Sequence, residues 1–255
     1  MGKAAQERFC RNPHLPKCQG RGIIIAAFGT KEGENEKNHK YALRRALLVA
    51  IPLIILAIVL VCVNSCKRED YRVLQADEIA RYTQGNEYSS REQEDFVEAA
   101  LSLVGKVRYF WGGKSSAVGW DDEWGTMKTV TSSGSSTTGT ERPYGLDCSG
   151  YVSWCFIQTG ATPQQMSQSI GEGTWNQWQK SGEIDKIEAR LGDIVFINRY
   201  PGATGNHIGI VVGFDAEGEP LIAHCTPSYD DVVVSTCGDQ FRYFRRPAFL
   251  EDNRQ

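Results

Sequence analysis

Histidine is scarce in this sequence, and the scarcity narrows the search for catalytic groups. Only four histidines occur among 255 residues, and two of them, His14 and His39, precede the long apolar run described below. The eight cysteines are spread thinly from Cys10 to Cys237, which excludes a small fold held together by a dense set of disulfides. We also find no internal repeat, which argues against a repeat architecture.

Most of the chain has no excess of basic over acidic side chains. Residues 71–255 carry 16 basic and 25 acidic side chains, a net charge of −9. Because phosphate binding requires a positively charged face, this balance argues against nucleic acid as the partner of that region. Only residues 1–45 are basic, with ten Lys or Arg against four Glu.

One long apolar run separates these two regions. Residues 46–63 read ALLVAIPLIILAIVLVCV, with no charged side chain among eighteen residues. As a helix this run is about 27 Å long, close to the roughly 30 Å hydrocarbon core of a bilayer. A buried core helix is the competing interpretation, but core helices rarely lack a polar face altogether. We therefore predict a single transmembrane helix over residues 46–63.

Charge predicts the orientation of this helix. Arg44 and Arg45 abut the apolar run, whereas the basic residues just after it are balanced by acidic ones. The positive-inside rule then places the N-terminus in the cytoplasm and the C-terminal part outside, in a single-pass protein of the cell membrane. A cleaved signal peptide and a lipoprotein signal at Cys62 or Cys66 are weaker alternatives, because the charged leader is long and the flanking residues fit poorly.

The remaining boundaries follow from composition. Residues 1–45 are predicted to be a cytoplasmic basic tail that is mostly disordered. Residues 64–88 are polar and mixed, and we predict a juxtamembrane linker there with a short helix near residues 73–82. The folded domain is predicted over residues 89–250.

Two groups of cysteines are candidates for a metal site or a disulfide. Cys10, His14 and Cys18 supply three ligands rather than the usual four of zinc, so we expect neither a metal site nor a cofactor. Cys225 and Cys237 lie in or beside neighbouring strand-like runs, and the sequence leaves open whether they form a disulfide.

The order of the predicted elements indicates an α+β fold. Ser89 and Ser90 precede Glu92 and Gln93 by three residues each, as in a capping box, and apolar residues at helical spacing follow up to Gly105. Helices first and strands afterwards are typical of helices packed on an antiparallel sheet. The strand-like runs are residues 191–197, 207–213, 221–224, 232–235 and 241–244, with a hairpin turn at 215–218.

Cys148 is the first candidate for a catalytic residue. It stands where a polar loop turns into a helical pattern, which Val152, Cys155 and Phe156 continue. A thiol in the first turn of a helix lies near unpaired N–H groups and the positive end of the helix dipole. Both favour the nucleophilic thiolate. Taken alone, however, a free cysteine is more often a buried packing residue.

The two histidines outside the tail strengthen the catalytic interpretation. His207 opens one strand-like run and His224 closes the next, so antiparallel pairing across the turn brings them together. Cysteine catalysis needs an imidazole within reach of the sulfur and a third polar group that orients the imidazole. Cys148, His207 and His224 supply this set.

Five short motifs follow one another over roughly residues 93–247. They are Tyr109-Phe110-Trp111-Gly112-Gly113, Leu146-Asp147-Cys148-Ser149-Gly150, Leu191-Gly192-Asp193, His207-Ile208-Gly209-Ile210-Val211-Val212-Gly213 and Ile222-Ala223-His224. In this order they resemble the motifs of the NlpC-type cell-wall peptidases, which are papain-like cysteine endopeptidases of bacteria.

The resemblance implies a papain-like core and a reaction. The reaction is hydrolysis of peptide bonds in the peptidoglycan stem, often between D-γ-glutamate and a diamino acid. Carried over by position, Cys148 is the nucleophile, His207 the general base and His224 the orienting residue.

The resemblance also implies substrate-binding residues. Tyr109, Asp147 and Ser149 match positions that shape the subsite for the amino side of the substrate. Trp111 joins them as a candidate, although plain core packing is the alternative for both aromatic residues. The backbone N–H of Cys148 would help to stabilise the oxyanion.

One departure from the family pattern is large. The segment between Gly113 and Leu146 is far longer than the compact pattern, and loops of this length are often functional or disordered. We expect the loop over residues 114–144 to cap the groove and to influence which bond is cleaved.

These observations lead to a first hypothesis of a membrane-anchored peptidoglycan endopeptidase. Two alternatives remain: an amidase or acyltransferase on the same fold, and an inactive wall-binding module of a membrane assembly. Machinery for division, secretion or conjugation is the expected setting, and the sequence does not choose among the three.

Overall fold

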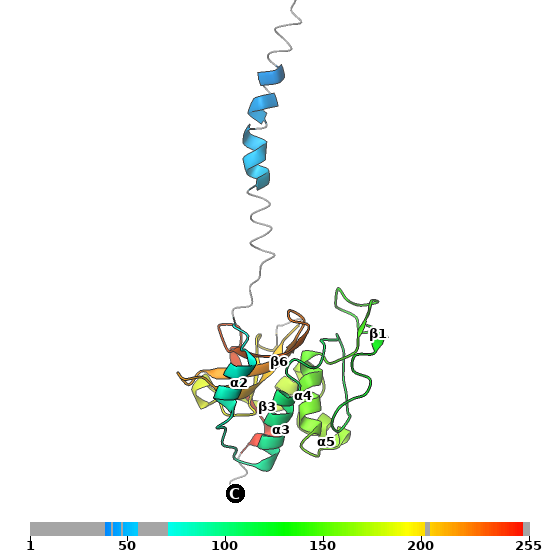
Figure 1. Ribbon diagram of the computed structural model, residues 1–255, viewed down its shortest axis with the longest axis vertical. Helices are drawn as coiled ribbons and strands as arrows, with labels where there is room; N and C mark the ends of the chain where they lie inside the picture. Colours follow the sequence, from blue (N-terminus) through cyan, green and yellow to red (C-terminus); the bar gives the residue numbers. More distant parts are fainter. Residues whose placement is uncertain (1–38, 42, 47, 56–70, 202–204, 252–255) are drawn as a thin grey trace, which may run out of the picture. The chain divides into compact units, whose positions relative to one another are not determined.

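The chain divides into two units, Met1–Lys67 and Arg68–Gln255. The structure, a computed structural model, describes residues 39–41, 43–46, 48–55, 71–201 and 205–251 (Figure 1).

In the first unit, all described residues between 39 and 55 are helical. The C-terminal half of the predicted transmembrane run, residues 56–63, lies outside the described residues, as do Cys10, His14 and Cys18. Across the ranges that are described, no helix combines the length and the apolar character needed to cross a membrane.

The second unit is built on a six-stranded sheet. Its strands lie in the order β3-β8-β4-β5-β6-β7, and every pair of neighbours is antiparallel. This arrangement confirms the α+β class with an antiparallel sheet. The strands are β3 (Ser181–Glu183), β4 (Ile194–Phe196), β5 (Ile208–Phe214), β6 (Pro220–Thr226), β7 (Asp231–Thr236) and β8 (Tyr243–Pro247).

The helices begin at recognisable capping residues. Ser90 accepts the N–H of Gln93 at 3.1 Å before α3, which is the cap that the sequence predicts. Thr162 caps α5, with Pro163 in the first turn, where proline costs no hydrogen bond. The α-helices of this unit are α2 (Ala76–Thr83), α3 (Arg91–Ser102), α4 (Cys148–Ile157), α5 (Pro163–Ser169) and α6 (Gly173–Gln179).

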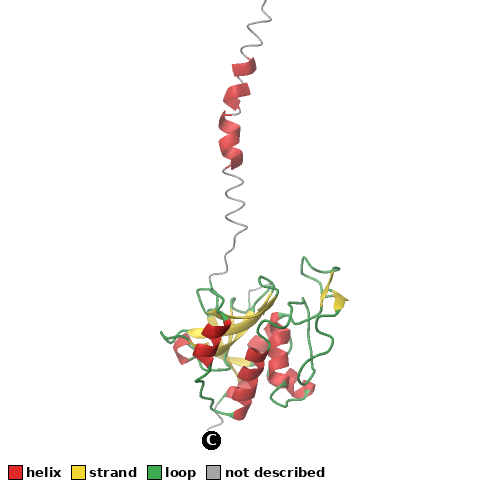
Figure 2. Ribbon diagram, viewed as in Figure 1, coloured by secondary structure: helices red, strands yellow, loops and turns green. Residues whose placement is uncertain are grey.

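Both faces of the sheet are covered by a core. Successive side chains of a strand point to opposite faces, so one strand contributes to both cores. Ile208 and Ile210 of β5 join the main core with α3 and α4. Val211 and Ile222 pack into a smaller core on the other face. The hydroxyl of Tyr151 fastens α4 to α3 by donating to the carbonyl of Ala100 at 2.8 Å, and the two helices lie side by side in Figure 2.

Two regions are more ordered than the sequence suggests. Tyr71 and Leu74, in the predicted linker, are buried, and the N–H of Leu74 donates to Val234 of β7 at 2.8 Å. Their apolar side chains stabilise the attachment of α2 to the sheet. Within the long loop, β1 (Met127–Thr129) and β2 (Glu141–Pro143) form a hairpin, which stands apart from the larger sheet in Figure 2.

Cys225 and Cys237 are both free thiols. Cys225 lies in the main core and donates to the carbonyl of Leu146 at 3.1 Å. Cys237 lies in the smaller core and donates to the carbonyl of Phe241 at 3.1 Å. The disulfide left open by the sequence is not formed, because the two side chains belong to different cores.

Candidate active site

Cys148 is the first residue of α4, as the sequence predicts. Asp147 caps this helix, and its Oδ1 accepts the N–H of Gly150 at 2.6 Å. All residues of α4 are buried, and Gln177 of α6 donates to the carbonyl of Ser149 at 2.8 Å. The thiol is therefore held on a helix end that is fixed by packing on several sides.

Loss of solvent dominates the electrostatics of this thiol. Only 6% of Cys148 is exposed, and burial raises its pKa to about 12, with the Asp147 carboxylate adding to the rise. The N–H groups of Ile208 and Ser149 and the ammonium of Lys114 act in the opposite direction and are outweighed. The N–H groups near the thiol do act toward the thiolate, as expected at a helix start, but burial outweighs them and favours the neutral thiol in the unliganded protein.

A row of three side chains crosses the neighbouring strands. Nε2 of His207 lies 2.9 Å from Nδ1 of His224, and Nε2 of His224 lies 3.0 Å from Oγ of Ser235. His207 directly precedes β5, while the other two residues lie in β6 and β7. The antiparallel hairpin thus brings the two histidines together, as the sequence predicts.

The surroundings of this row keep both imidazoles neutral. The rings of Tyr71 and Phe241 lie 5.0 and 5.1 Å from the ring of His224. Burial lowers the pKa of His207 to about 4. Burial, followed by the effect of His207, lowers the pKa of His224 well below its ordinary value.

Ile208 connects the row to the thiol. Its backbone N–H reaches the sulfur of Cys148, so the start of β5 lies against the first turn of α4. Within residues 71–201 and 205–251, no hydrogen bond joins this sulfur directly to His207; such bonds are often long in unliganded enzymes. Because Nε2 of His207 faces His224, Nδ1 is the nitrogen left for the thiol.

Cys148 opens onto a pocket of about 500 Å³. Trp111, Asp147 and Ser149, all predicted substrate-binding residues, line this pocket together with it. The other lining residues are Gly112, Lys114, Ser132, Ser133, Gly173, Thr174, Tyr200, Gly205 and Asn206.

Tyr109, the fourth predicted substrate-binding residue, lies beside this pocket rather than in its lining. It pairs with Leu146 in an isolated bridge, and the N–H of Leu146 donates to Arg108 at 3.1 Å. Burial raises the pKa of the Tyr109 phenol, with smaller contributions from Cys148 and Asp147. The phenol therefore stays protonated close to the thiol.

The long loop forms one wall of the pocket. Nε1 of Trp111 donates to the carbonyl of Ser133 at 2.9 Å, and both Ser132 and Ser133 face the cavity. The loop thus borders the groove, which is where a segment that influences substrate choice must lie.

The sequence model of the NlpC/P60 family matches residues 105–242, more than half of the chain. This chain belongs to the NlpC/P60 family.

The chain is also similar to curated proteins and to solved structures. The bifunctional muramidase/DL-endopeptidase CwlT of Bacillus subtilis is 26% identical over 144 residues, which are 54% of this chain and 34% of CwlT. The chain therefore aligns with about a third of that relative.

Two solved structures from Mycobacterium tuberculosis are similar in fold. The peptidoglycan hydrolase RipB is 22% identical with a TM-score of 0.43, covering 69% of this chain and 73% of RipB. RipD, described as a non-catalytic NlpC/p60 domain protein adapted to peptidoglycan binding, is 17% identical with a TM-score of 0.41, covering 62% of this chain and 98% of RipD.

Two polar residues of this NlpC/P60 site escaped the sequence analysis. Ser235 lies eleven residues after His224, and only the β6–β7 register, with Ile222 opposite Ser235, brings it near. Lys114 stands at the start of the long loop, where no periodicity marks it. A lysine that directly follows the double glycine of the aromatic motif was the one available signal.

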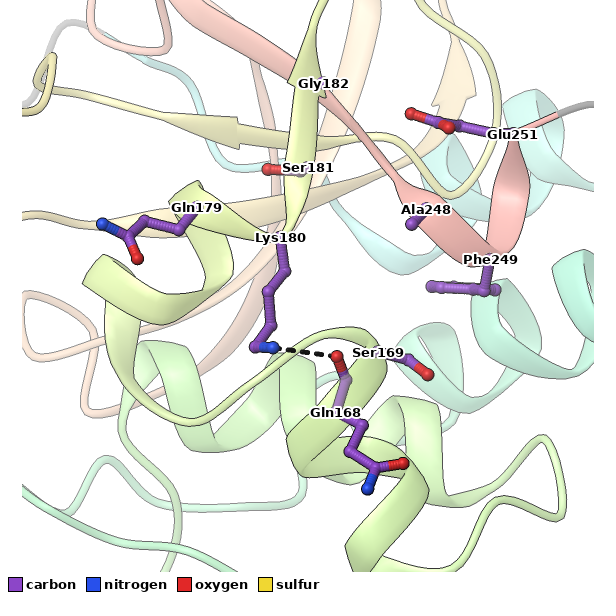
Figure 3. Close-up of a pocket in the computed structure, with 9 residues that line it drawn as sticks. All are labelled: Gln168, Ser169, Gln179, Lys180, Ser181, Gly182, Ala248, Phe249 and Glu251. Carbon is purple, nitrogen blue, oxygen red and sulfur yellow. Dashed lines mark hydrogen bonds between the residues drawn. The ribbon is translucent and has the colours of Figure 1, made fainter.

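A second, larger pocket of about 610 Å³ lies elsewhere in the unit. Figure 3 shows Lys180 reaching across it to the carbonyl of Gln168, with Glu251 and Phe249 on the other side. No candidate catalytic residue lines it. Among the described residues, no three His, Cys, Asp or Glu side chains are placed to hold a metal ion.

Proposed function

We propose that this protein is a peptidoglycan hydrolase that cleaves stem-peptide bonds of the D-γ-glutamyl–diamino acid type, with Cys148 as the nucleophile. The observation that carries the proposal is a thiol at the start of a buried helix, open to a pocket and beside the His207–His224–Ser235 row. Membership of the NlpC/P60 family and the DL-endopeptidase activity named for CwlT support it.

The row of hydrogen bonds gives each ring nitrogen a role. When Nε2 of His207 donates to His224, and Nε2 of His224 donates to Ser235, Nδ1 of His207 carries no proton. That nitrogen can then accept the proton of the Cys148 thiol and later donate it to the leaving amine. His224 thus selects the tautomer and orientation of the base, as an orienting residue must.

The resting state of this pair is neutral. With the thiol pKa raised to about 12 and the imidazole pKa lowered to about 4, an ion pair is strongly disfavoured before substrate binds. We therefore infer that proton transfer accompanies attack on the carbonyl. As the first residue of α4, Cys148 has a backbone N–H without an acceptor inside the helix, and this N–H can stabilise the developing oxyanion.

The test compares the full-length protein with a Cys148→Ala variant on purified peptidoglycan under reducing conditions, with products identified by mass. We expect stem-peptide fragments from the wild type and a fall of about 1000-fold or more in the variant. Cys155→Ala is a matched control, because Cys155 is a buried cysteine of the same helix, and it should retain cleavage.

Other products would contradict the proposal in distinct ways. Cleavage at the sugar–peptide junction would indicate an amidase, and transfer of the acyl group to an amine would indicate an acyltransferase. Binding of peptidoglycan without any product would indicate a wall-binding module.

We further propose that residues 46–63 anchor the protein in the cell membrane with residues 1–45 in the cytoplasm. The apolar run and the ten basic side chains before it support this orientation. Protease added outside intact cells should digest the C-terminal part and spare the tail. Release of the protein from membranes by alkaline carbonate would contradict the anchor.

A further inference from the structure

Lys114 brings a positive charge into the pocket beside Cys148. Its ammonium lies 2.8 and 2.9 Å from the two carboxylate oxygens of Asp147 and 2.7 Å from Oγ of Ser149. These two partners are the residues expected to bind the amino side of a substrate. The side chain of Lys114 is 36% exposed and lines the cavity.

The Asp147 carboxylate has no capacity left for a ligand. Its Oδ1 accepts three hydrogen bonds, from Lys114, from Ser149 Oγ at 2.7 Å and from the N–H of Gly150 at 2.6 Å. Its Oδ2 accepts from Lys114, and only 11% of the side chain is exposed. A carboxylate accommodates about four donors, so a further ammonium would have to displace Lys114.

The backbone on both sides holds Lys114 in this position. The N–H of Asp147 donates to the carbonyl of Gly113 at 3.1 Å. A Cβ on Gly150 would lie 2.1 Å from that same carbonyl and 3.2 Å from Cδ of Lys114. Only glycine at position 150 permits this approach, and the lysine stem therefore packs directly over the first turn of α4.

The rest of the pocket offers no other charge. Lys114 and Asp147 are the charged side chains among the described lining residues, and they are paired with each other. The remaining walls are neutral: the loop serines, Trp111, Thr174, Tyr200 and Asn206. A protonated amine entering the pocket would meet the Lys114 ammonium and would find no carboxylate free to pair with it.

We propose, building on the hydrolase function proposed above, that Lys114 is a specificity-determining residue that selects stem peptides with an acylated amino end. Such an end occurs where the stem is joined to the glycan strand by an amide. A peptide with a free, protonated α-amine is rejected by the like charge of Lys114 and by the saturated carboxylate. The substrate class is therefore the glycan-linked stem rather than the released peptide.

The experiment measures kcat/KM of the full-length protein, in mild detergent, on two synthetic peptides. One is a stem tripeptide of alanine, γ-linked glutamate and diamino acid with a free α-amine, and the other is the same peptide acetylated at that amine. We expect the wild type to prefer the acetylated peptide by about tenfold or more. In Lys114→Met, this preference should fall by about tenfold.

Two further variants separate charge from shape. Lys114→Arg keeps a cation beside Asp147 and should keep most of the preference. Lys106→Met removes a lysine that caps the end of α3 through the Ser102 carbonyl and does not line the pocket, so it should behave like the wild type. Because each preference is a ratio within one protein, a general loss of activity cancels.

A second readout needs no substitution. The α-amine of a peptide has a pKa of about 8, so the free peptide becomes neutral as the pH rises from 7 to 9. The wild-type preference should shrink over this range, because the free peptide loses the positive charge that the Lys114 ammonium repels.

Two results would overturn the assignment of Lys114 while leaving the hydrolase function in place. One is equal cleavage of both peptides by the wild type, and the other is a preference that does not change in Lys114→Met. Failure to cleave either peptide or purified peptidoglycan would instead overturn the proposed function itself.

Discussion

The two sides of the Cys148 thiol handle polar groups in opposite ways. On the strand side, His207 and His224 lie among aromatic rings and are neutral, because burial lowers the pKa of both imidazoles. On the loop side, Lys114 and Asp147 form an ion pair at 2.8 Å. On the loop side, two opposite charges compensate each other near solvent. On the strand side, burial instead disfavours the charged form of both histidines.

This difference separates the tasks of the two sides. A neutral imidazole can accept a proton, which a general base must do. The ion pair cannot take part in proton transfer in the same way, but it defines the charge that a substrate meets. Changes on the strand side should therefore affect proton chemistry, and changes on the loop side should affect helix capping and selectivity.

The largest expected effect is a loss of unfolding free energy when acid protonates the histidines of the strand side. The folded-state pKa of His207 is about 4, below its ordinary value of 6.5, so protonation favours the unfolded chain. The stability contribution is complete above pH 6.5 and is lost as the pH falls toward 4, by about 3 kcal/mol for His207. Urea unfolding at pH 7, 6 and 5 measures it.

The control for this prediction is His207→Gln, which cannot titrate in that range. Its stability should fall less steeply between pH 6.5 and 4 than that of the wild type. Identical slopes for the two proteins would show that the His207 ring protonates at no cost in the folded state.

Substitution of Asp147 on the loop side should cause a smaller loss of unfolding free energy. Asp147→Ala removes the cap of α4 and leaves the buried N–H of Gly150 without its acceptor, so we expect a loss of about 2 kcal/mol in unfolding free energy. Asp147→Asn keeps a capping side chain and should cost less than about 1 kcal/mol. Urea unfolding at pH 7 distinguishes them.

Equal losses in the two Asp147 variants would mean that the ion pair with Lys114, rather than the cap, supplies the stability. In that case the two sides of the thiol would differ less than the structure indicates.

The smallest expected effect is at the far end of the histidine row. Ser235→Ala leaves Nε2 of His224 buried without a partner, at a cost of about 1 kcal/mol in unfolding free energy. We expect kcat to fall less than about tenfold with KM unchanged, because His224 loses its orientation but not its contact with His207. Ser116→Ala, on the exposed part of the loop, is the control.

A change in KM alone for Ser235→Ala would contradict this role. It would place Ser235 in substrate binding rather than in the orientation of the histidine row.

Much of the fold was predictable because it depends on short-range patterns. The capping serine of α3, the cysteine at the start of α4 and the hairpin between β5 and β6 are set by residues a few positions apart. The transmembrane prediction rests on the same kind of pattern, and half of that run lies outside the described residues.

The candidate site was predictable only in part. Alternation and a turn were enough to bring His207 to His224. Ser235 comes near His224 only through the pairing of β7 with β6. Lys114 is itself the loop residue that contacts Asp147, across 33 positions of the sequence. No periodicity encodes either contact.

By itself, the sequence determined which groups can do chemistry and in what order they occur: a thiol at a helix start, two histidines on adjoining strands and an α+β arrangement. The tertiary structure decided their protonation and their surroundings. Burial outweighed the helix-end effect on Cys148 and favours its thiol form, and a long-range contact placed Lys114 on the carboxylate expected to bind substrate. Both outcomes follow from desolvation and proximity, which depend on the whole packed chain rather than on neighbouring residues.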